Sequence, residues 1–200
     1  MTRSNRERGS SMMELPPALL VFFFAVLFPL INLMGLAVGT ATIAMIGQQT
    51  VQAAANASSY GQALNSMQTC AQNMMNTGFA KFAKLKPVQG YNQCGTDLYV
   101  LITTIASNKV QSTAANQPIS QAIDTTNNLY EYQTRVVYKV VPFINMSGIP
   151  LVKNIPGVGS DSEIQWVSTS NVEFPDGLLS SGSGKGQVVG GGKGPEDKAP

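Results

Sequence analysis

The chain contains no histidine, and only 12% of its 200 residues are charged, about half the share found in an ordinary soluble domain. The lack of histidine removes the commonest general base and the commonest metal ligand. The few acidic residues are scattered, and no pair of them falls in a recognisable catalytic arrangement. We therefore expect no enzymatic activity, no bound metal and no cofactor.

A strong excess of positive charge is also missing, because the formal net charge is only +2. Proteins that bind nucleic acids usually carry a basic patch that neutralises the phosphate backbone. Neither the composition nor the spacing of basic residues provides one here. Nucleic acid is therefore not an expected partner.

One long uncharged segment dominates the sequence instead. From Leu15 to Ile46 the chain has no formal charge, and about 20 apolar residues suffice to cross a bilayer as a helix. The short flank before it contains Arg3, Arg6 and Arg8 against a single Glu7, and basic flanks stay in the cytoplasm. The sequence predicts a cytoplasmic leader at 1–9, a transmembrane helix at 10–47 and an exported C-terminal part, with membrane lipid around the helix.

A cleaved secretory signal peptide is the main alternative to this anchor. Its apolar region should span only 7 to 15 residues. The run observed here is much longer, although Ala53–Ala55 offers an Ala-x-Ala match for a signal peptidase. We expect an anchor.

The second half of the apolar run contains Gly35 and Gly39 in GxxxG spacing, with Ala37 and Ala41 repeating the small-residue pattern. Small residues at this spacing let helix backbones approach closely within a membrane. Glycine and alanine are also simply common in membrane helices. The pattern therefore indicates either helix packing at Gly35 and Gly39 or ordinary membrane-helix composition.

The boundary before the apolar run carries a more specific pattern, RGSSMMELPPALL, in which Glu14 stands five residues after Gly9. A basic leader, a glycine, four uncharged residues, a glutamate and a long apolar helix together resemble the class III signal of type IV pilins and pseudopilins. The resemblance implies cleavage by a prepilin peptidase between Gly9 and Ser10. It also implies that Glu14 directs assembly by pairing with the new amino group of a neighbouring subunit, since a buried carboxylate needs a cationic partner.

Within that superfamily the order of elements is most similar to the TadE/TadG-like pseudopilins of the tight-adherence (Flp) pilus system. This resemblance implies a structural component of the bacterial inner membrane that contributes to a pilus or a related secretion apparatus. Its implied partners are the prepilin peptidase, other pilin-like subunits and the assembly platform. An uncleaved, membrane-anchored exported binding module is the alternative.

The exported part begins with a helical pattern. Apolar residues recur at spacings of four and three in one stripe: Tyr60, Leu64, Met67, Ala71 and Met74. This periodicity predicts an amphipathic helix over 48–86 that continues the membrane helix and ends before Pro87. The stripe needs a partner, which is either the protein's own domain or another copy or pilus component.

Two later segments alternate between apolar and polar residues, near 130–141 and 163–174, and this pattern predicts an antiparallel strand pair. The stretch 97–110 fits either a helix or a strand, and its β-branched residues favour a strand. Together with the helices, these segments predict an α+β fold for an exported pilin-like domain over 48–176. The glycine-rich residues 177–200 predict a disordered tail.

Cysteine is almost absent, since only Cys70 and Cys94 occur. In an exported chain such a pair is typically oxidised, and closing a loop of about 25 residues would constrain the unfolded state by roughly 3 kcal/mol. Two thiolates without histidine fall short of the four ligands of a structural zinc site. The sequence therefore predicts a disulfide between Cys70 and Cys94.

Overall fold

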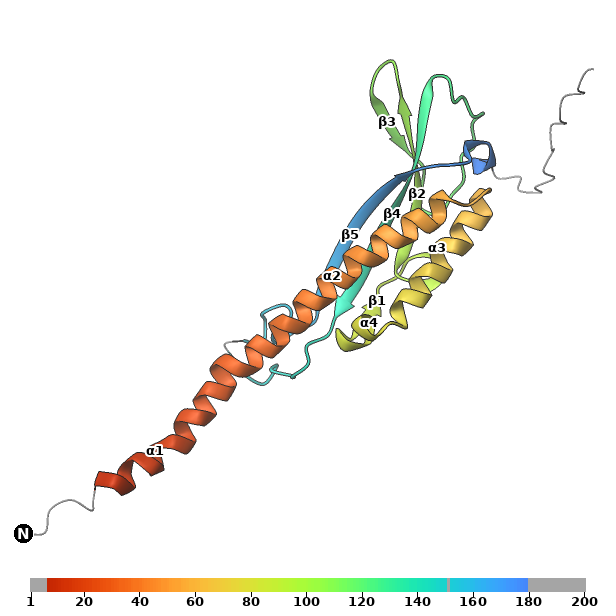
Figure 1. Ribbon diagram of the computed structural model, residues 1–200. Helices are drawn as coiled ribbons and strands as arrows, with labels where there is room; N and C mark the ends of the chain where they lie inside the picture. The colour runs from red at the N-terminus through yellow and green to blue at the C-terminus, as the bar shows by residue number, and fades with distance from the viewer. Residues whose placement is uncertain (1–6, 151, 180–200) are drawn as a thin grey trace, which may run out of the picture.

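The computed structural model describes residues 7–150 and 152–179, with side chains from residue 15 onward, and shows a small α+β domain built on one end of a long helix (Figure 1). The helix consists of α1 (Glu7–Phe22), a π-helical turn η1 (Phe23–Leu27) and α2 (Phe28–Ala55). Pro29 lies in the first turn of α2, directly after η1. Proline has no backbone N–H and cannot donate a helical hydrogen bond. The π-turn changes the hydrogen-bond pattern of the helix just before this proline.

The long helix ends at Ala55, and the chain then reverses instead of continuing as one helix to residue 86. Asn56 caps α2, and Ser59 begins α3 (Tyr60–Met75) by accepting a hydrogen bond from the backbone N–H of Gln62 at 3.4 Å. A serine hydroxyl at this position satisfies an N–H that the first helical turn leaves without a partner. The predicted continuous helix over 48–86 is therefore wrong, because Ser59 starts a new helix that runs back beside α2 (Figure 1).

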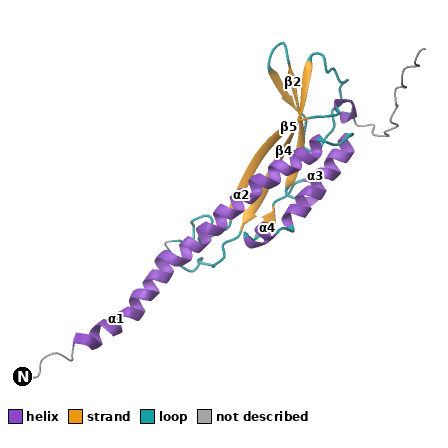
Figure 2. Ribbon diagram, viewed as in Figure 1, coloured by secondary structure: helices purple, strands orange, loops and turns teal. Residues whose placement is uncertain are grey.

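A second cap follows in the same way. The side chain of Thr77 accepts a hydrogen bond from the N–H of Ala80 and begins the short helix α4 (Gly78–Phe82). In Figure 2, α4 lies at the end of the domain nearest to α1.

The sheet is antiparallel throughout, and its central strand is β4 (Asn128–Val140). The predicted strand near 163–174 is β5 (Ser162–Asn171), which pairs with β4 from Val140↔Ser162 to Glu131↔Asn171. The other edge of β4 pairs first with the short β1 and then with β2, and β2 forms a hairpin with β3; their bounds are Leu85–Pro87, Thr96–Thr104 and Lys109–Ser112. The ambiguous stretch 97–110 is thus mostly strand, and the expected α+β class is confirmed.

Alternation along β4 explains how the sheet meets the helices. Six residues in alternate positions are buried, namely Tyr130, Tyr132, Thr134, Val136, Tyr138 and Val140. They face α2 and α3, which lie across one side of the sheet (Figure 2). Because successive side chains of a strand point to opposite faces, the intervening residues remain on the other face, and Arg135 is exposed there.

The hydrophobic core has two parts along α2. The part distant from α1 joins Val51 and Ala54 of α2 to Met67 of α3 and to Val100 and Tyr132 of the sheet. The part nearer to α1 gathers the following buried residues: Ile43, Ile46, Ala80, Ala83, Leu85, Val136, Tyr138 and Val140. Of the five stripe residues, Tyr60, Leu64, Met67 and Ala71 are buried within the chain, and Met74 is partly buried against the part of the core nearer to α1. Their partner is therefore the protein's own domain.

The C-terminal segment also departs from expectation. Leu178, within the 3₁₀ turn η3 (Pro175–Leu178), is 0% exposed, and its carbonyl accepts a hydrogen bond from the N–H of Ile119 at 3.4 Å. Gly177 packs against the backbone of Ser58. The predicted disordered tail is therefore wrong for residues 177–179, because an apolar leucine there closes the core; residues 180–200 lie outside the described part of the chain.

A matched pair of glycines tests how tightly α2 packs on the sheet. A Cβ at Gly47 would lie 2.8 Å from Cδ1 of Trp166, whereas a Cβ at Gly61 in α3 would meet nothing within 4 Å. We expect Gly47→Ala to lower the free energy of unfolding by about 1–2 kcal/mol through overpacking, and Gly61→Ala to raise it by up to about 1 kcal/mol through helix propensity. Urea unfolding of the full-length chain in detergent micelles, followed by far-UV circular dichroism, measures both. Equal shifts for the two variants would contradict the packing described here.

Candidate functional site

The long helix has two chemically different halves. From Leu15 to Ile31 most large apolar side chains are exposed, for example Leu20 at 57% and Val21 at 62%. From Asn32 onward one face of α2 is buried against the domain. The helix is long and apolar enough to cross a membrane, and we call its exposed part, residues 15–31, the bare segment.

The predicted processing and assembly residues lie just before the bare segment. Gly9, Ser10 and Glu14 all have helical backbone within α1, on the side of the bare segment away from the domain. The side chains of residues 7–14 lie outside the described part of the structure. The roles assigned to Gly9, Ser10 and Glu14 therefore remain predictions.

Asn32 marks the point where the helix enters the domain, and its side chain is only 1% exposed. Its Nδ2 donates hydrogen bonds to the carbonyl oxygens of Ile144 at 2.9 Å and Val158 at 2.7 Å. Its Oδ1 accepts a hydrogen bond from the backbone N–H of Ile144 at 2.9 Å. A carboxamide offers two donors and an acceptor, and here all three have partners in one loop between β4 and β5.

This loop wraps one side of α2 at the level of Asn32, and we call residues 142–150 and 152–158 the collar. The ring of Phe143 occupies the space where a side chain at Gly35 would lie. On the other arm, a Cβ at Gly157 would meet Leu36 at 2.6 Å, and the φ of +77° at Gly157 is a left-handed conformation that favours glycine. Both arms of the collar thus contact the helix between residues 32 and 36.

The small-residue pattern in the helix serves this intramolecular contact. Gly35 faces Phe143, and a Cβ at Gly39 would lie 2.7 Å from Val140, the last residue of β4. Glycines let another backbone or a bulky side chain approach the helix closely, whether or not the partner is a helix. The predicted helix–helix packing at Gly35 and Gly39 is replaced within this chain by packing against a strand end and a loop.

The predicted disulfide is absent, since Cys70 and Cys94 are both free thiols. Cys94 is buried, and its Sγ donates a weak hydrogen bond to the carbonyl of Thr96 at 3.5 Å. The hydroxyl of Tyr138 donates to the carbonyl of Cys94 at 2.6 Å, and burial raises the pKa of Tyr138 to about 12, so the donor keeps its proton at neutral pH. These contacts fix Cys94 in the turn before β2, and the expectation of a bridge is corrected.

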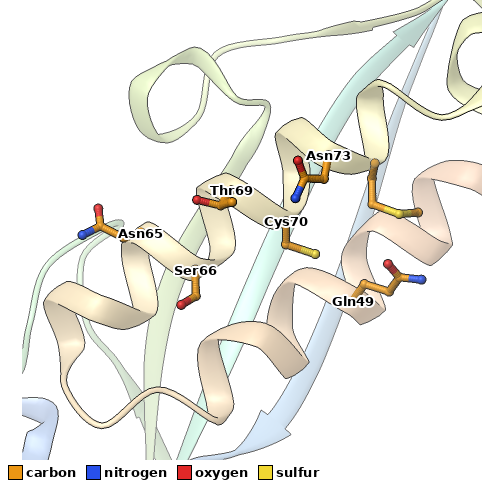
Figure 3. A pocket seen from close by; sticks show the side chains of 7 residues that line it. Gln49, Asn65, Ser66, Thr69, Cys70 and Asn73 are labelled. Carbon is orange, nitrogen blue, oxygen red and sulfur yellow. The ribbon is translucent and has the colours of Figure 1, made fainter.

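Cys70 lies elsewhere, in a groove between α2 and α3 (Figure 3). The groove has a volume of about 520 Å³ and is lined by Gln49, Asn65, Ser66, Thr69, Cys70, Asn73 and Met74. Its polar side chains are amides and hydroxyls, and burial raises the pKa of the Cys70 thiol, which favours the unreactive form. The groove therefore lacks an activated nucleophile or a general base.

Metal binding finds no support in the described residues either, because no three metal-ligating side chains come together there. Comparison of the chain with protein-family models, curated proteins and solved structures found no match. The distinctive features of this structure are therefore the bare segment, the pattern that precedes it and the collar that holds the other end.

Sequence reasoning overlooked Asn32 and the collar. One signal was present, since Asn32 is the first amide in an uncharged run of apolar residues. A polar side chain inside such a run usually has a specific partner. The partner could not be identified from the sequence, because it is the backbone of a segment more than 110 residues away.

Replacing the carboxamide tests whether the collar depends on it. Asn32→Ala leaves two carbonyls and one N–H without partners in a buried site, and each unsatisfied group costs about 1–3 kcal/mol. We expect hydrogen exchange of collar amides to accelerate by at least about tenfold, as measured by mass spectrometry on the full-length chain in detergent micelles. Thr40→Ala is the control, because the hydroxyl of Thr40 bonds only to Leu36 of its own helix. Unchanged collar exchange in Asn32→Ala would show that the carboxamide does not hold the loop.

The thiols provide a second test. Burial raises the pKa of both Cys70 and Cys94, so the folded chain holds less thiolate near neutral pH and should be alkylated more slowly than a chain with exposed cysteines. Denaturation removes this protection. We therefore expect the unreduced protein, alkylated under denaturing conditions, to gain the mass of two added groups. A chain that accepts none until it is reduced would carry a disulfide and refute the free-thiol assignment.

Proposed function

We propose that this chain is a pseudopilin or minor pilin-like structural component of a tight-adherence pilus or a related secretion apparatus. The observation that carries the proposal is the pattern RGSSMME directly before the bare segment of a long apolar helix. The pattern is that of a prepilin peptidase substrate, with cleavage between Gly9 and Ser10. The other end of the same helix is fixed in a small α+β domain.

The exposure of the bare segment supports an assembly role. Within the described structure, residues 15–31 receive little cover from the rest of the chain. Large apolar side chains in this number need lipid or other apolar helices around them. A subunit that is stored in the membrane and then packs against similar helices would use the same surface in both states.

Glu14 has a defined place in this proposal. After cleavage, Ser10 would carry the new amino group, and Glu14 would follow four residues later, on the same face of a helix. A carboxylate at the edge of an apolar segment is costly unless it is paired, and an amino group on a neighbouring subunit would provide the pair. Pairing of this kind would fix the axial register of neighbouring helices.

The proposal places the protein in the bacterial inner membrane, with the leader in the cytoplasm and the α+β domain outside. Its partners would be membrane lipid, a prepilin peptidase, other pilin-like subunits and the assembly platform. In the alternative function, the chain is an uncleaved anchor for an exported binding module and Glu14 has no role in assembly.

The N-terminus of the mature protein distinguishes the two functions. We expect the membrane-extracted chain from cells with a prepilin peptidase to begin at Ser10, and its intact mass to be smaller by residues 1–9. Gly9→Leu should keep the full mass, because it removes the glycine after which the proposed peptidase cuts. A wild-type chain that retains residues 1–9 in the presence of an active peptidase would leave only the anchor function.

Two variants, each of which neutralises one glutamate, test the role of Glu14 in assembly. Glu14→Gln should reduce incorporation into sheared pili or the assembled complex by about tenfold or more. Removing one partner of a buried ion pair costs about 3–5 kcal/mol, and about 1.4 kcal/mol already corresponds to a tenfold change. Membrane insertion should not change. Glu7→Gln is the matched control, because Glu7 would leave with the leader. Equal incorporation of Glu14→Gln and wild type would exclude the assembly role of Glu14.

A further inference from the structure

The distance along the long helix from Leu15 to the collar can be compared with the thickness of a bilayer. Asn32 and Leu36, where both arms of the collar contact α2, lie 17 and 21 positions after Leu15. At about 1.5 Å per residue these positions are about 25 to 32 Å along the helix from the start of the apolar run. The hydrocarbon core of a bilayer is about 30 Å thick. A membrane that begins near Leu15 therefore ends at the collar.

Helix α4 lies farther along the long helix, since Ala83, directly after α4, packs close to Gly39, 24 positions after Leu15. That position is about 36 Å from the start of the apolar run, within the headgroup layer beyond the hydrocarbon core. Aromatic contacts join α4 to the collar. The rings of Phe82 in α4 and Phe143 in the collar have centroids 4.8 Å apart. Lys84, just after α4, places its Nζ 5.2 Å from the centroid of the Phe143 ring and donates a hydrogen bond to the Phe143 carbonyl at 3.4 Å. Phe143 itself packs on Gly35. The two segments thus form one surface around the helix, at the end of the domain that faces α1 (Figure 2).

The exposed side chains of this surface have an unusual composition. The apolar ones are Phe79, Phe82 and Ile155, which are 66%, 43% and 45% exposed. The charged side chains of residues 78–87 and of the collar are basic and exposed, and we call the following set the membrane-proximal face: Phe79, Lys81, Phe82, Lys84, Lys86, Lys153 and Ile155. Asp161, three residues after the collar, is an exposed acid that lines a pocket with Pro142 and Asn145. Residues 76–96 and 141–160 contain no acidic residue. Within the described part of the chain, none of these four lysines forms an ion pair.

We infer that the membrane-proximal face docks on the anionic phospholipid headgroups of the membrane that the helix enters. Aromatic rings are favoured at the boundary between hydrocarbon and headgroups, and lysines near the surface are attracted by anionic lipid. The collar contacts at residues 32–36 and the packing of Ala83 near Gly39 bring both kinds of side chain to the headgroup layer. The inference depends on the helix crossing the membrane, as its length and composition allow, and does not require pilus assembly.

Depth measurements in nanodiscs test the location of the face. In a Trp166→Phe background, Phe79→Trp places the single tryptophan on the membrane-proximal face, and Ile105→Trp places it in the β2–β3 turn, where Ile105 is 59% exposed. The full-length chain is reconstituted with lipids brominated near the headgroup end of their acyl chains. We expect quenching at position 79 to exceed quenching at position 105 several-fold. Equal quenching at the two positions would overturn the inference.

Lipid charge and lysine variants test the chemistry of the contact. Nanodiscs of phosphatidylcholine alone are compared with nanodiscs containing phosphatidylglycerol, and we expect quenching at position 79 to increase in the second. Lys81→Gln with Lys86→Gln should abolish that increase, because about half of the basic charge of the face is removed. Lys109→Gln with Arg135→Gln removes the same charge elsewhere and should preserve the increase.

A second copy of the protein is the competing occupant of this face. If burial of position 79 depended on the number of copies in each nanodisc and not on lipid charge, the face would be a protein contact and the inference would be wrong. Loss of the lipid effect in the Lys109 and Arg135 double variant as well would point to net charge alone and would also overturn it. Failure of Gly9 cleavage or of pilus assembly would leave these results unaffected.

Discussion

The three hydrogen bonds of Asn32 fix the position of the α+β domain on its long helix. A carboxamide inside an apolar helix cannot remain without partners, in lipid or in a protein core, since each lost hydrogen bond there costs more than in water. Here the partners are backbone groups on the two arms of one loop. The loop is therefore held against one side of the helix at that residue, and the boundary between the bare and the packed half of the helix lies there.

Beyond Asn32, α2 also packs tightly against the domain. Gly35, Gly39 and Gly47 each face a bulky side chain of the domain, from Phe143, Val140 and Trp166 in turn. The hydroxyl of Thr134 on β4 reaches across to the carbonyl of Gly47 at 3.1 Å. Absence of a side chain at these positions lets the sheet and the collar lie directly on the helix backbone. The residues that resemble a membrane-helix dimer motif thus contribute to an intramolecular core.

Much of the secondary structure could be predicted from local patterns, and the errors have physical causes. The alternation of tyrosines and valines in β4 and the apolar stripe of α3 are periodic signals, and the structure buries those residues. The break between α2 and α3 could not be predicted from periodicity, because the alanine-rich end of α2 and the start of α3 have the composition of one continuous helix. Only the hydrogen bond from the N–H of Gln62 to the Ser59 side chain shows that a new helix begins there. The free cysteines were missed because pairing depends on the fold and not on their number.

The candidate site likewise has a part that the sequence alone predicts and a part that only the structure shows. Gly9, Ser10 and Glu14 form a linear pattern, which a sequence can show by itself. The collar and the membrane-proximal face join residues that are far apart in the chain, such as Gly35 with Phe143 and Phe82 with Phe143. Contacts of that kind depend on the register of β4 and β5 and on the path of the connection between them. No local period in the sequence encodes them.

The long helix is shared, without a break, by the bare segment and the domain, and this sets how far the domain can reach. A domain on a flexible tether explores a volume whose radius grows with the length of the linker. A domain on a stiff helix instead stays at one height and moves mainly by tilting or rotating the whole helix. A partner at that height would meet a high effective concentration of the domain, and a partner at another height would meet almost none.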